Sequence, residues 1–388
     1  MAAIAASPRP IPWVNPFLGV RIREVDGLRG TAILLVLFFH YITSISAPEH
    51  HLWSIVTTTT RLFWSGVDLF FVLSGFLISG ILIDSADSPH YYKTFYLRRF
   101  HRIFPLYFGW LALLYLGVSL SLDSKLGTHI FHSDLPLWLY PVFLQNNAPL
   151  LLNVDAPVWM AMSWSLAVEE QFYLVLPALV RFLNRTVLGW LCAATILLSP
   201  IFRYLLVHYN PGLNMGWPFS TFARLDSLAM GVSVALLARN ETCWNFLTRR
   251  AAALKGCALL LFCVLVLITY FPRPDSEMGL YGFSILGLFY SLLLVLAICR
   301  PVSAPALSAV LKNGLLLYLG RVSYAIYILH QGVRALVDVM VPKLGHFNSV
   351  RVIAVVALAL LTTILLANLS WSALESKLIR RAHLRYKY

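Results

Sequence analysis

An arginine and a histidine can share one face of the first apolar segment. Arg29 and His40 flank the run GTAILLVLFF. Eleven residues are three helical turns plus about 20°, so in a helix both side chains point the same way, roughly 16 Å apart along the axis. A neutral imidazole in a dry pocket can remove a proton from a hydroxyl at neutral pH, which makes His40 a candidate general base. The alternative is that Arg29 reaches the lipid headgroups and His40 is a hydrogen-bonded interior histidine.

A basic cluster lies just before a proline in the sequence LRRFHRIFP. Spacings of three and four place Arg102 beside both Arg98 and Arg99 on a helix. Guanidinium groups match pairs of phosphate oxygens, so this cluster could bind the phosphates of a nucleotide-like cofactor that approaches from the cytoplasm. The alternative is ordinary anchoring of a cytoplasmic helix end by basic residues.

Hydroxyl and carboxylate side chains recur at helical spacing in SWSLAVEEQFY, residues 163–173. Ser165, Glu169 and Tyr173 stand at i, i+4 and i+8 and therefore share one helix face. A carboxylate near a helix N-terminus is also favoured by the helix dipole. A plain helix start would explain one carboxylate but not two carboxylates, an aromatic residue and two hydroxyls together, so we expect a functional site here.

Polar side chains in three further apolar stretches need partners, because a charge in the bilayer core costs about 2.5–3.5 kcal/mol. Asp68, in GVDLFFVLSGF, could pair with a cation or orient His40. A purely structural ion pair is the alternative, with Gly75 allowing close helix packing. The others are interpreted mainly as interhelical hydrogen-bonding residues that support the site: Arg224 and Asp226 in ARLDSLAMG, and Ser323, Tyr324, Tyr327 and His330 in GRVSYAIYILHQ.

The composition places these residues in a membrane protein. Of the 388 residues, 59% are hydrophobic and 12% charged, and the mean hydropathy is +0.74. Soluble domains have about 45–50% apolar and about 25% charged residues, so a soluble, disordered, fibrous or disulfide-rich secreted protein is excluded. The net charge of +13 is explained by Lys and Arg at cytoplasmic helix ends and indicates no nucleic-acid partner. The five cysteines have no CxxC or Cys/His spacing, so we infer no metal or redox chemistry.

Ten apolar runs are long enough to cross a bilayer, which requires about 20 residues. They cover residues 28–46, 63–83, 103–121, 166–183, 187–207, 221–238, 255–271, 279–299, 316–340 and 350–371. With the N-terminus in the cytoplasm, 21 Lys and Arg residues fall inside, five outside and four within spans. The positive-inside rule therefore predicts an all-α polytopic helical bundle of about ten transmembrane helices, with both termini cytoplasmic. The first run lacks a convincing cleavage site, so we expect a retained helix and not a removed signal peptide.

One membrane domain accounts for nearly the whole chain. We predict a cytoplasmic N-terminal segment at 1–27, a membrane domain at 28–372 and a basic cytoplasmic tail at 373–388, with no internal repeat. Residues 135–144 are apolar, but Pro136 and Pro141 break them and they are too short to span. We expect this piece to be a re-entrant or interfacial segment.

These motifs together resemble the acyltransferase-3 family of integral membrane acyltransferases. The resemblance rests on Asp26-Gly-Leu-Arg29 with His40, on GVDLFFVLSGF, LRRFHRIFP, WSLAVEEQFY, RLDSLAMG and GRVSYAIYILH, in family order over roughly residues 25–375. Two positions depart from the family pattern. Met162 stands where many members have a histidine, and Glu375 is followed by Ser-Lys where a Glu-x-Pro pattern is usual. Some relatives carry an additional esterase-like domain, and we expect the stand-alone form here.

The resemblance implies roles for the candidate residues. His40 would be the catalytic base and Arg29 part of the same site, with Glu169 and Ser165 in the element that lines it. Contact with the phosphates of acyl-CoA would fall to the basic cluster of Arg98, Arg99 and Arg102. A short acyl group, acetyl by default, would then pass to a hydroxyl of a sugar. The expected acceptor is a surface polysaccharide, a lipopolysaccharide or its lipid-linked precursor, at the bacterial inner membrane.

Other functions fit parts of the sequence. Polar residues within spans also mark the pathways of transporters, so a non-catalytic transporter or flippase of a lipid-linked glycan is the main alternative. The absence of an inverted repeat and the cytoplasmic arginine cluster count against it, and turnover of acyl-CoA would separate the two. Acylation of a small natural product and a non-catalytic scaffold are further alternatives. If the protein is an acyltransferase, the acyl group could pass directly to the acceptor or through a covalent acyl-histidine intermediate.

Overall fold

The protein is a bundle of helices. A computed structural model describes residues 21–43, 60–120, 130–152, 154, 156–209, 217–270, 278–299, 305–340 and 350–388. Within these ranges every regular element is helical and none is a β-strand. Seven described helices are long and apolar enough to cross a membrane, or eight if the bent pair α8–α9 counts as one span. The predicted fold class, a polytopic all-α membrane protein, is confirmed.

Each of the ten predicted spans overlaps one helix. In chain order these are α1 (Arg23–Phe38), α3 (Gly66–Asp84), α4 (Tyr91–Leu120), α6 (Ser163–Phe182), α7 (Arg185–Tyr209), α8 (Thr221–Leu237), α10 (Ala251–Tyr270), α12 (Phe283–Ile298), α14 (Gly314–Met340) and α15 (Val350–Ser370). The shorter helices are α5 (Ala148–Leu152), α9 (Glu241–Arg249), α13 (Pro305–Leu311) and α16 (Ser376–Arg385). Three of the ten, α6, α8 and α14, are by themselves too short or too polar to count among these membrane-spanning helices. The reason is that α8 has 17 residues, while α6 and α14 carry the polar side chains discussed below.

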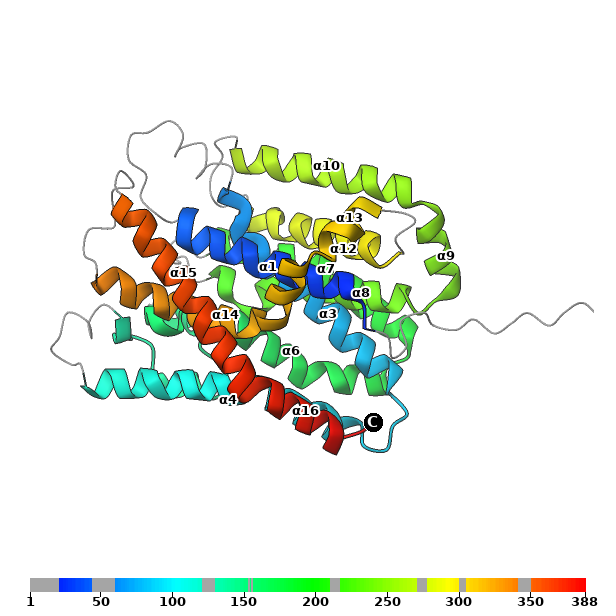
Figure 1. The fold of residues 1–388 in the computed structure, drawn as a ribbon. Coiled ribbons are helices and arrows are strands. Elements are labelled where there is room, and N and C mark those ends of the chain that lie inside the picture. Colours follow the sequence, from blue (N-terminus) through cyan, green and yellow to red (C-terminus); the bar gives the residue numbers. More distant parts are fainter. Residues whose placement is uncertain are drawn as a thin grey trace, which may run out of the picture.

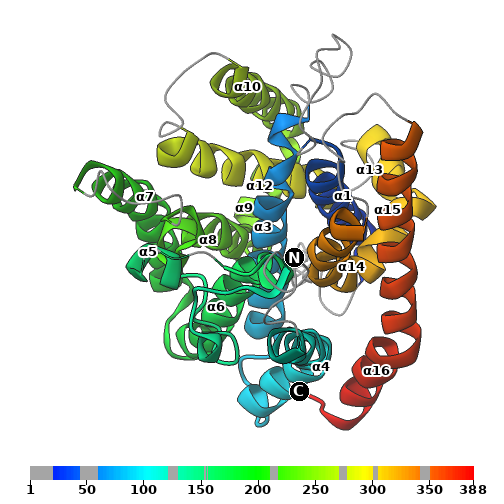
Figure 2. The same ribbon diagram turned by 90° about the vertical axis from the view of Figure 1, so that its left-hand side faces the viewer.

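Helix α3 occupies the middle of the bundle. Seen along the helices it lies beside α1, with α12, α8, α6, α4 and α14 around the two (Figure 2). Accordingly 83% of its most apolar window is buried, against 11% for α10 at the edge. The apolar side chains of α10 therefore face outward, where lipid would contact them, while α3 is surrounded by protein.

Glycine lets the central helices approach to backbone contact. A Cβ added at Gly30 of α1 would lie 2.0 Å from the backbone oxygen of Leu316 on α14. A Cβ added at Gly75 of α3 would lie 2.1 Å from the backbone oxygen of Leu228 on α8. Within lipid the hydrophobic effect does little to hold helices together. Small residues allow the close van der Waals packing that stabilises such crossings instead. The predicted packing role of Gly75 is thus confirmed.

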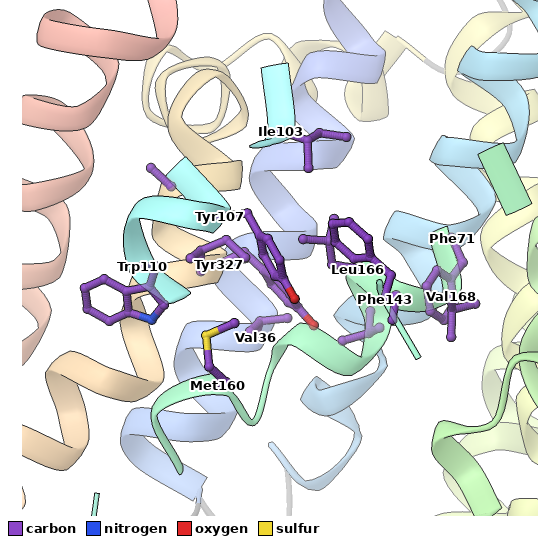
Figure 3. Close-up of a cluster of buried hydrophobic side chains, with 14 of the residues drawn as sticks. Val36, Phe71, Ile103, Tyr107, Trp110, Phe143, Met160, Leu166, Val168 and Tyr327 are labelled. Carbon is purple, nitrogen blue, oxygen red and sulfur yellow. The ribbon is translucent and has the colours of Figure 1, made fainter. Parts of the chain in front are cut away.

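Residues 135–144 form no long helix. They contain a single 3-10 turn at Leu137–Leu139, after which Phe143 adopts a left-handed backbone with φ of 55°. The ring of Phe143 stacks on Tyr107 of α4, with ring centroids 4.7 Å apart. Figure 3 shows Phe143 among buried side chains of α4 and α14, including Tyr107 and Tyr327. The segment is therefore folded against the bundle, as a non-spanning piece must be, and its re-entrant or interfacial position stays a prediction.

The C-terminal residues form a helix that contacts α4. After α15 a π-turn at Trp371–Glu375 leads directly into α16, so one helical stretch runs over Ala354–Arg385, and part of it is apolar enough to cross a membrane. Helix α16 crosses the start of α4 (Figure 1). Thr94 Oγ1 of α4 donates a hydrogen bond of 2.9 Å to the backbone oxygen of Lys387. The residues expected as a basic cytoplasmic tail are thus helical and contact α4, and their position in the cytoplasm stays a prediction.

Candidate active site

A cavity of about 290 Å³ lies among α1, α3, α4, α6 and α14. Its wall on α3 extends from Val67 to Ile81, fourteen residues apart, which is about 21 Å of helix. Apolar side chains of α3 form much of this wall. The polar side chains that line the cavity come from all five helices: Arg29, Ser74, Arg99, Arg102, Ser165, Glu169, Tyr173, Ser323, Tyr324 and Tyr327. An elongated, mostly apolar cavity with a few convergent polar groups is the usual form of a small-molecule site.

Three arginines give the cavity a positive character. Arg29 of α1 donates from Nη2 to Ser323 Oγ of α14 at 3.0 Å. Arg99 lies over the Tyr173 ring, 5.5 Å from its centroid. Among the described residues, no hydrogen bond or ion pair engages the guanidinium of Arg99 or Arg102. Three cations against one lining carboxylate, two of them with donors to spare, form a site suited to an anion.

The predicted stripe on α6 faces this cavity. Ser165, Glu169 and Tyr173 all line it, as their spacing requires. Tyr173 donates its hydroxyl proton to Glu169 Oε2 at 2.9 Å, so the hydrogen bond between Tyr173 and Ser74 must have Ser74 as its donor. Tyr173 is thereby fixed between α3 and α6, where its ring supports Arg99.

A second hydrogen-bonded pair lies on α6 and α14. Ser165 Oγ and Tyr327 Oη are 2.5 Å apart, and both residues line the cavity. Tyr327 was expected only as a supporting residue, and Tyr324 one helical turn earlier lines the same wall. The cavity wall therefore carries hydroxyl groups as well as the guanidinium groups of Arg29, Arg99 and Arg102.

Arg98 differs from its two neighbours in the basic cluster. Its Nε and Nη2 both donate to the backbone oxygen of Tyr386, at 2.9 and 2.5 Å, and its guanidinium lies over the Tyr388 ring. Because Arg98 is one residue before Arg99, it points to another side of α4. The sequence grouped all three arginines, but Arg98 holds the C-terminal segment and does not line the cavity.

His40 lies outside the cavity lining, beyond Tyr327. Helix α1 ends at Phe38 and continues as a π-turn at Phe39–Thr43, which carries His40. Its Nδ1 donates to the backbone oxygen of Val36 at 2.9 Å, so Nε2 is the basic nitrogen. The His40 ring lies 5.0 Å from the His330 ring, and the His330 ring lies 5.8 Å from the Tyr327 ring. Two aromatic contacts thus connect His40 to the cavity.

Asp68, Arg224 and Asp226 belong to a separate cluster that joins α3, α7 and α8. Asp68 pairs with Arg224 at 3.0 Å, and Asp226 pairs with Arg203 at 2.9 Å. Arg203 also donates to the backbone oxygens of Ala223 and Leu280 and to the hydroxyl of Ser284. Of the two possibilities for Asp68, pairing with a cation is observed, and this carboxylate is directed to Arg224. These residues do not line the cavity.

Ser74 and Arg203 are polar residues to which the sequence gave no role, while Ser323 was expected only as an interhelical hydrogen-bonding residue. Ser74 and Ser323 form hydrogen bonds with residues that line the cavity. Ser74 could have been predicted as a lining residue, because it lies two helical turns after Val67 on the same face of α3. Arg203 lies within an apolar span and is fully buried. An intramembrane arginine requires a counter-ion, so a pairing with a carboxylate such as Asp226 could have been predicted.

Known proteins similar to this chain include several named as O-acetyltransferases. A putative peptidoglycan O-acetyltransferase of Bacillus subtilis, YrhL, is 27% identical over 377 residues, covering 91% of this chain and 54% of that protein. The peptidoglycan O-acetyltransferase OatA of Listeria monocytogenes is 26% identical over 380 residues, covering 94% and 57% respectively. A putative O-acetyltransferase of Staphylococcus aureus strain COL is 25% identical over 375 residues, covering 92% and 57%.

The similarity extends over nearly all of this chain but only part of those relatives. The chain spans just over half the length of the curated relatives it matches. No solved structure gave a significant match. The model of one protein family, described as an acyltransferase domain, matches residues 22–368, which include the cavity, its arginines and both histidines. This chain therefore belongs to the acyltransferase-3 family of membrane acyltransferase domains.

Proposed function

We propose that this protein transfers a short acyl group, acetyl by default, from acyl-CoA to a hydroxyl of a surface glycan at the bacterial cytoplasmic membrane. One observation carries the proposal. Arg99 and Arg102 line an elongated cavity together with Arg29, and their guanidinium groups have no ion-pair partner among the described residues. The relatives named as O-acetyltransferases support the same reaction class.

The cavity arginines would hold the donor. The phosphates of CoA match the unpaired guanidinium groups of Arg99 and Arg102, with Arg29 as a third cation. The pantetheine arm is a narrow chain, and the wall of α3 between Ile81 and Val67 offers about 21 Å of apolar surface for it. The thioester would then lie near the hydroxyls of Ser165 and Tyr327. Arg98, which holds Tyr386, is no longer assigned to the donor site.

The acceptor hydroxyl would approach from the side of His40. The Nε2 nitrogen removes the hydroxyl proton as the oxygen attacks the thioester carbonyl. The new carbon–oxygen bond replaces the carbon–sulfur bond, CoA leaves as thiolate, and the proton on His40 restores the thiol. Tyr327 contacts the His330 ring and bonds Ser165 in the cavity wall, where a hydroxyl donor could stabilise the negative charge on the carbonyl oxygen.

Acyl transfer in isolated membranes tests this proposal. Membranes that contain the protein are incubated with radiolabelled acetyl-CoA, and label is measured in the glycan and lipid fractions. The wild type is expected to transfer label, and His40→Ala to lose the transfer. Arg102→Ala is expected to raise the acetyl-CoA concentration needed for half-maximal transfer. Arg98→Ala is the matched control, since it removes a neighbouring arginine of the same helix that does not line the cavity.

The outcomes separate the enzyme from its main alternative. A transporter of lipid-linked glycans would consume no acyl-CoA in any variant. Full activity in His40→Ala would reject the histidine as base while leaving an acyltransferase. Equal effects of Arg98→Ala and Arg102→Ala would reject the donor site in the cavity.

A further inference from the structure

The cavity continues along α3 past the level of Arg99. Ser74 of α3 is hydrogen-bonded to Tyr173, and the guanidinium of Arg99 lies over the Tyr173 ring. Arg99 is therefore level with Ser74. Val67 lines the same cavity seven residues before Ser74, which is about 10 Å of helix. A stretch of cavity wall thus extends from the level of Arg99 toward the start of α3.

The hydrogen-bonded pair of Ser165 and Tyr327 lies along this stretch. The Tyr327 ring is 6.0 Å from the ring of Phe70, which is one helical turn closer to the start of α3 than the level of Arg99. On α6, Ser165 is likewise two turns from Tyr173, over which Arg99 lies. Contacts on two helices therefore place the two hydroxyls beyond Arg99, on the side of Val67.

Past this pair the cavity continues as a short apolar pocket. Its lining side chains are those of Val67, Phe70, Phe71 and Leu166. Val67 precedes Phe70 by three residues, so the pocket is about 5 Å long. Val67 and Leu166 are each 6% exposed and Phe71 is 0% exposed. Ile81, at the other extreme of the α3 wall, is 38% exposed, so the cavity is more open near Ile81 than near Val67.

Contact between α1 and α3 holds Val67 in place. A Cβ added at the adjacent Gly66 would lie 2.5 Å from the backbone oxygen of Ala32, so the two backbones touch there. One turn along α3, the Phe71 ring contacts the Trp164 ring of α6, with ring centroids 6.0 Å apart. Because packed interiors resist rearrangement, the side chain of Val67 sets the depth of the pocket.

We propose that this pocket holds the alkyl part of the acyl group, and that Val67 limits it to a short chain. The inference rests on the proposed function, which places the thioester near Ser165 and Tyr327. With the carbonyl group at these hydroxyls, the methyl group of acetyl enters the pocket in front of Val67. Each additional methylene extends the chain toward Val67, and a butyryl group has to displace this side chain. Val67 thus determines donor specificity and takes no part in proton transfer.

The preference for acyl chain length tests this inference. Acetyl-, propionyl- and butyryl-CoA are compared as donors in isolated membranes, and kcat/KM is measured for each. One methylene in an apolar pocket changes kcat/KM by about 10- to 200-fold, so the wild type should prefer acetyl-CoA to butyryl-CoA by at least this factor. Val67→Ala removes two carbon atoms, as many as butyryl adds to acetyl. It should raise the ratio of kcat/KM for butyryl-CoA to that for acetyl-CoA by about tenfold or more.

A second variant changes the pocket in the opposite direction. Val67→Ile adds one carbon atom and should lower the ratio of kcat/KM for propionyl-CoA to that for acetyl-CoA by about tenfold. Val72→Ala is the matched control, because Val72 is a fully buried valine of the same helix that does not line the cavity. It should leave both ratios unchanged. The inhibition constant of CoA, which has no acyl group, should be the same in both Val67 variants as in the wild type.

The outcomes separate this inference from the proposed function. An unchanged ratio of butyryl to acetyl transfer in a folded Val67→Ala protein, or an equal rise in Val72→Ala, would overturn the inference. A rise in Ile81→Ala without one in Val67→Ala would also overturn it, because the acyl chain would then lie at the other extreme of the α3 wall. If Val67→Ala does not fold, the propionyl ratio of Val67→Ile decides. Absence of transfer from all three donors in the wild type would instead reject the proposed function.

Discussion

Two clusters of charged side chains lie within the same bundle and differ in how their charges are matched. In the cluster of Arg203, Asp226, Arg224 and Asp68, each arginine has a carboxylate at 2.9 or 3.0 Å, and the four side chains are at most 3% exposed. In the cavity, Arg99 and Arg102 face open volume without an ion pair among the described residues. Both clusters are dominated by arginine, so residue type alone does not separate them.

The difference indicates which cluster is structural and which binds a ligand. A buried charge is tolerated when its partner is fixed in place, and the matched cluster fixes α3, α7 and α8 together. A charge directed into a cavity without a fixed partner gives no such cohesion and is explained by a ligand that brings the opposite charge. The matched cluster should therefore control stability, and the cavity arginines should control binding.

The largest expected effect is on stability. Asp226→Ala leaves Arg203 buried without its carboxylate, which should destabilise the fold by about 3–5 kcal/mol. We expect a sharp fall in folded yield and in thermal stability in detergent. The double variant Arg203→Met/Asp226→Leu removes both charges and should recover most of the yield. A stable Asp226→Ala protein with impaired transfer would contradict the structural role of this cluster.

The next effect is on donor binding. Removal of Arg99 or Arg102 deletes charge-assisted hydrogen bonds to a phosphate, each worth about 1.5–3 kcal/mol. Arg99→Ala and Arg102→Ala should each raise the KM for acetyl-CoA by roughly 10- to 150-fold. Thermal unfolding should be unchanged, since neither guanidinium has an ion pair to lose. Loss of folded protein would place these arginines with the structural cluster.

A smaller effect is expected at the tyrosine that links α3 to α6. Tyr173→Phe keeps the ring beneath Arg99 but removes the hydroxyl that bonds Glu169 and Ser74. These hydrogen bonds act on transfer only through the position of the Tyr173 ring, so we expect transfer to fall by about five-fold, equivalent to about 1 kcal/mol. Steady-state kinetics measure this, and a fall as large as that of Arg99→Ala would assign Tyr173 a direct part in the chemistry.

The smallest effect on activity is expected at Arg98. Arg98→Ala should leave transfer within about two-fold of wild type, since the side chain bonds Tyr386 and not the cavity. The C-terminal segment should loosen, because a charged hydrogen bond of about 1.5–3 kcal/mol is lost. Limited trypsin digestion with mass spectrometry would then show faster cleavage after Arg385 and Lys387. An unchanged cleavage rate together with impaired transfer would return Arg98 to the donor site.

The helical period predicted correctly which side chains line the cavity in one helix and incorrectly in another. The spacing of Ser165, Glu169 and Tyr173 placed them on one wall, because the helix period fixes neighbours within a single helix. The same reasoning grouped Arg98 with Arg99, although adjacent residues on a helix point about 100° apart. It also placed His40 on the face of Arg29, without foreseeing the π-turn at Phe39–Thr43 or the contact with His330.

The sequence by itself determined that this is a polytopic helical membrane protein, because apolar runs of about 20 residues in lipid must satisfy their backbone hydrogen bonds within helices. It also determined which polar residues need an explanation, since each is expensive in a bilayer. Only the tertiary structure decided their partners. Asp68 bonds Arg224 and His40 lies against His330 because packing between distant helices, which no sequence spacing encodes, sets those distances.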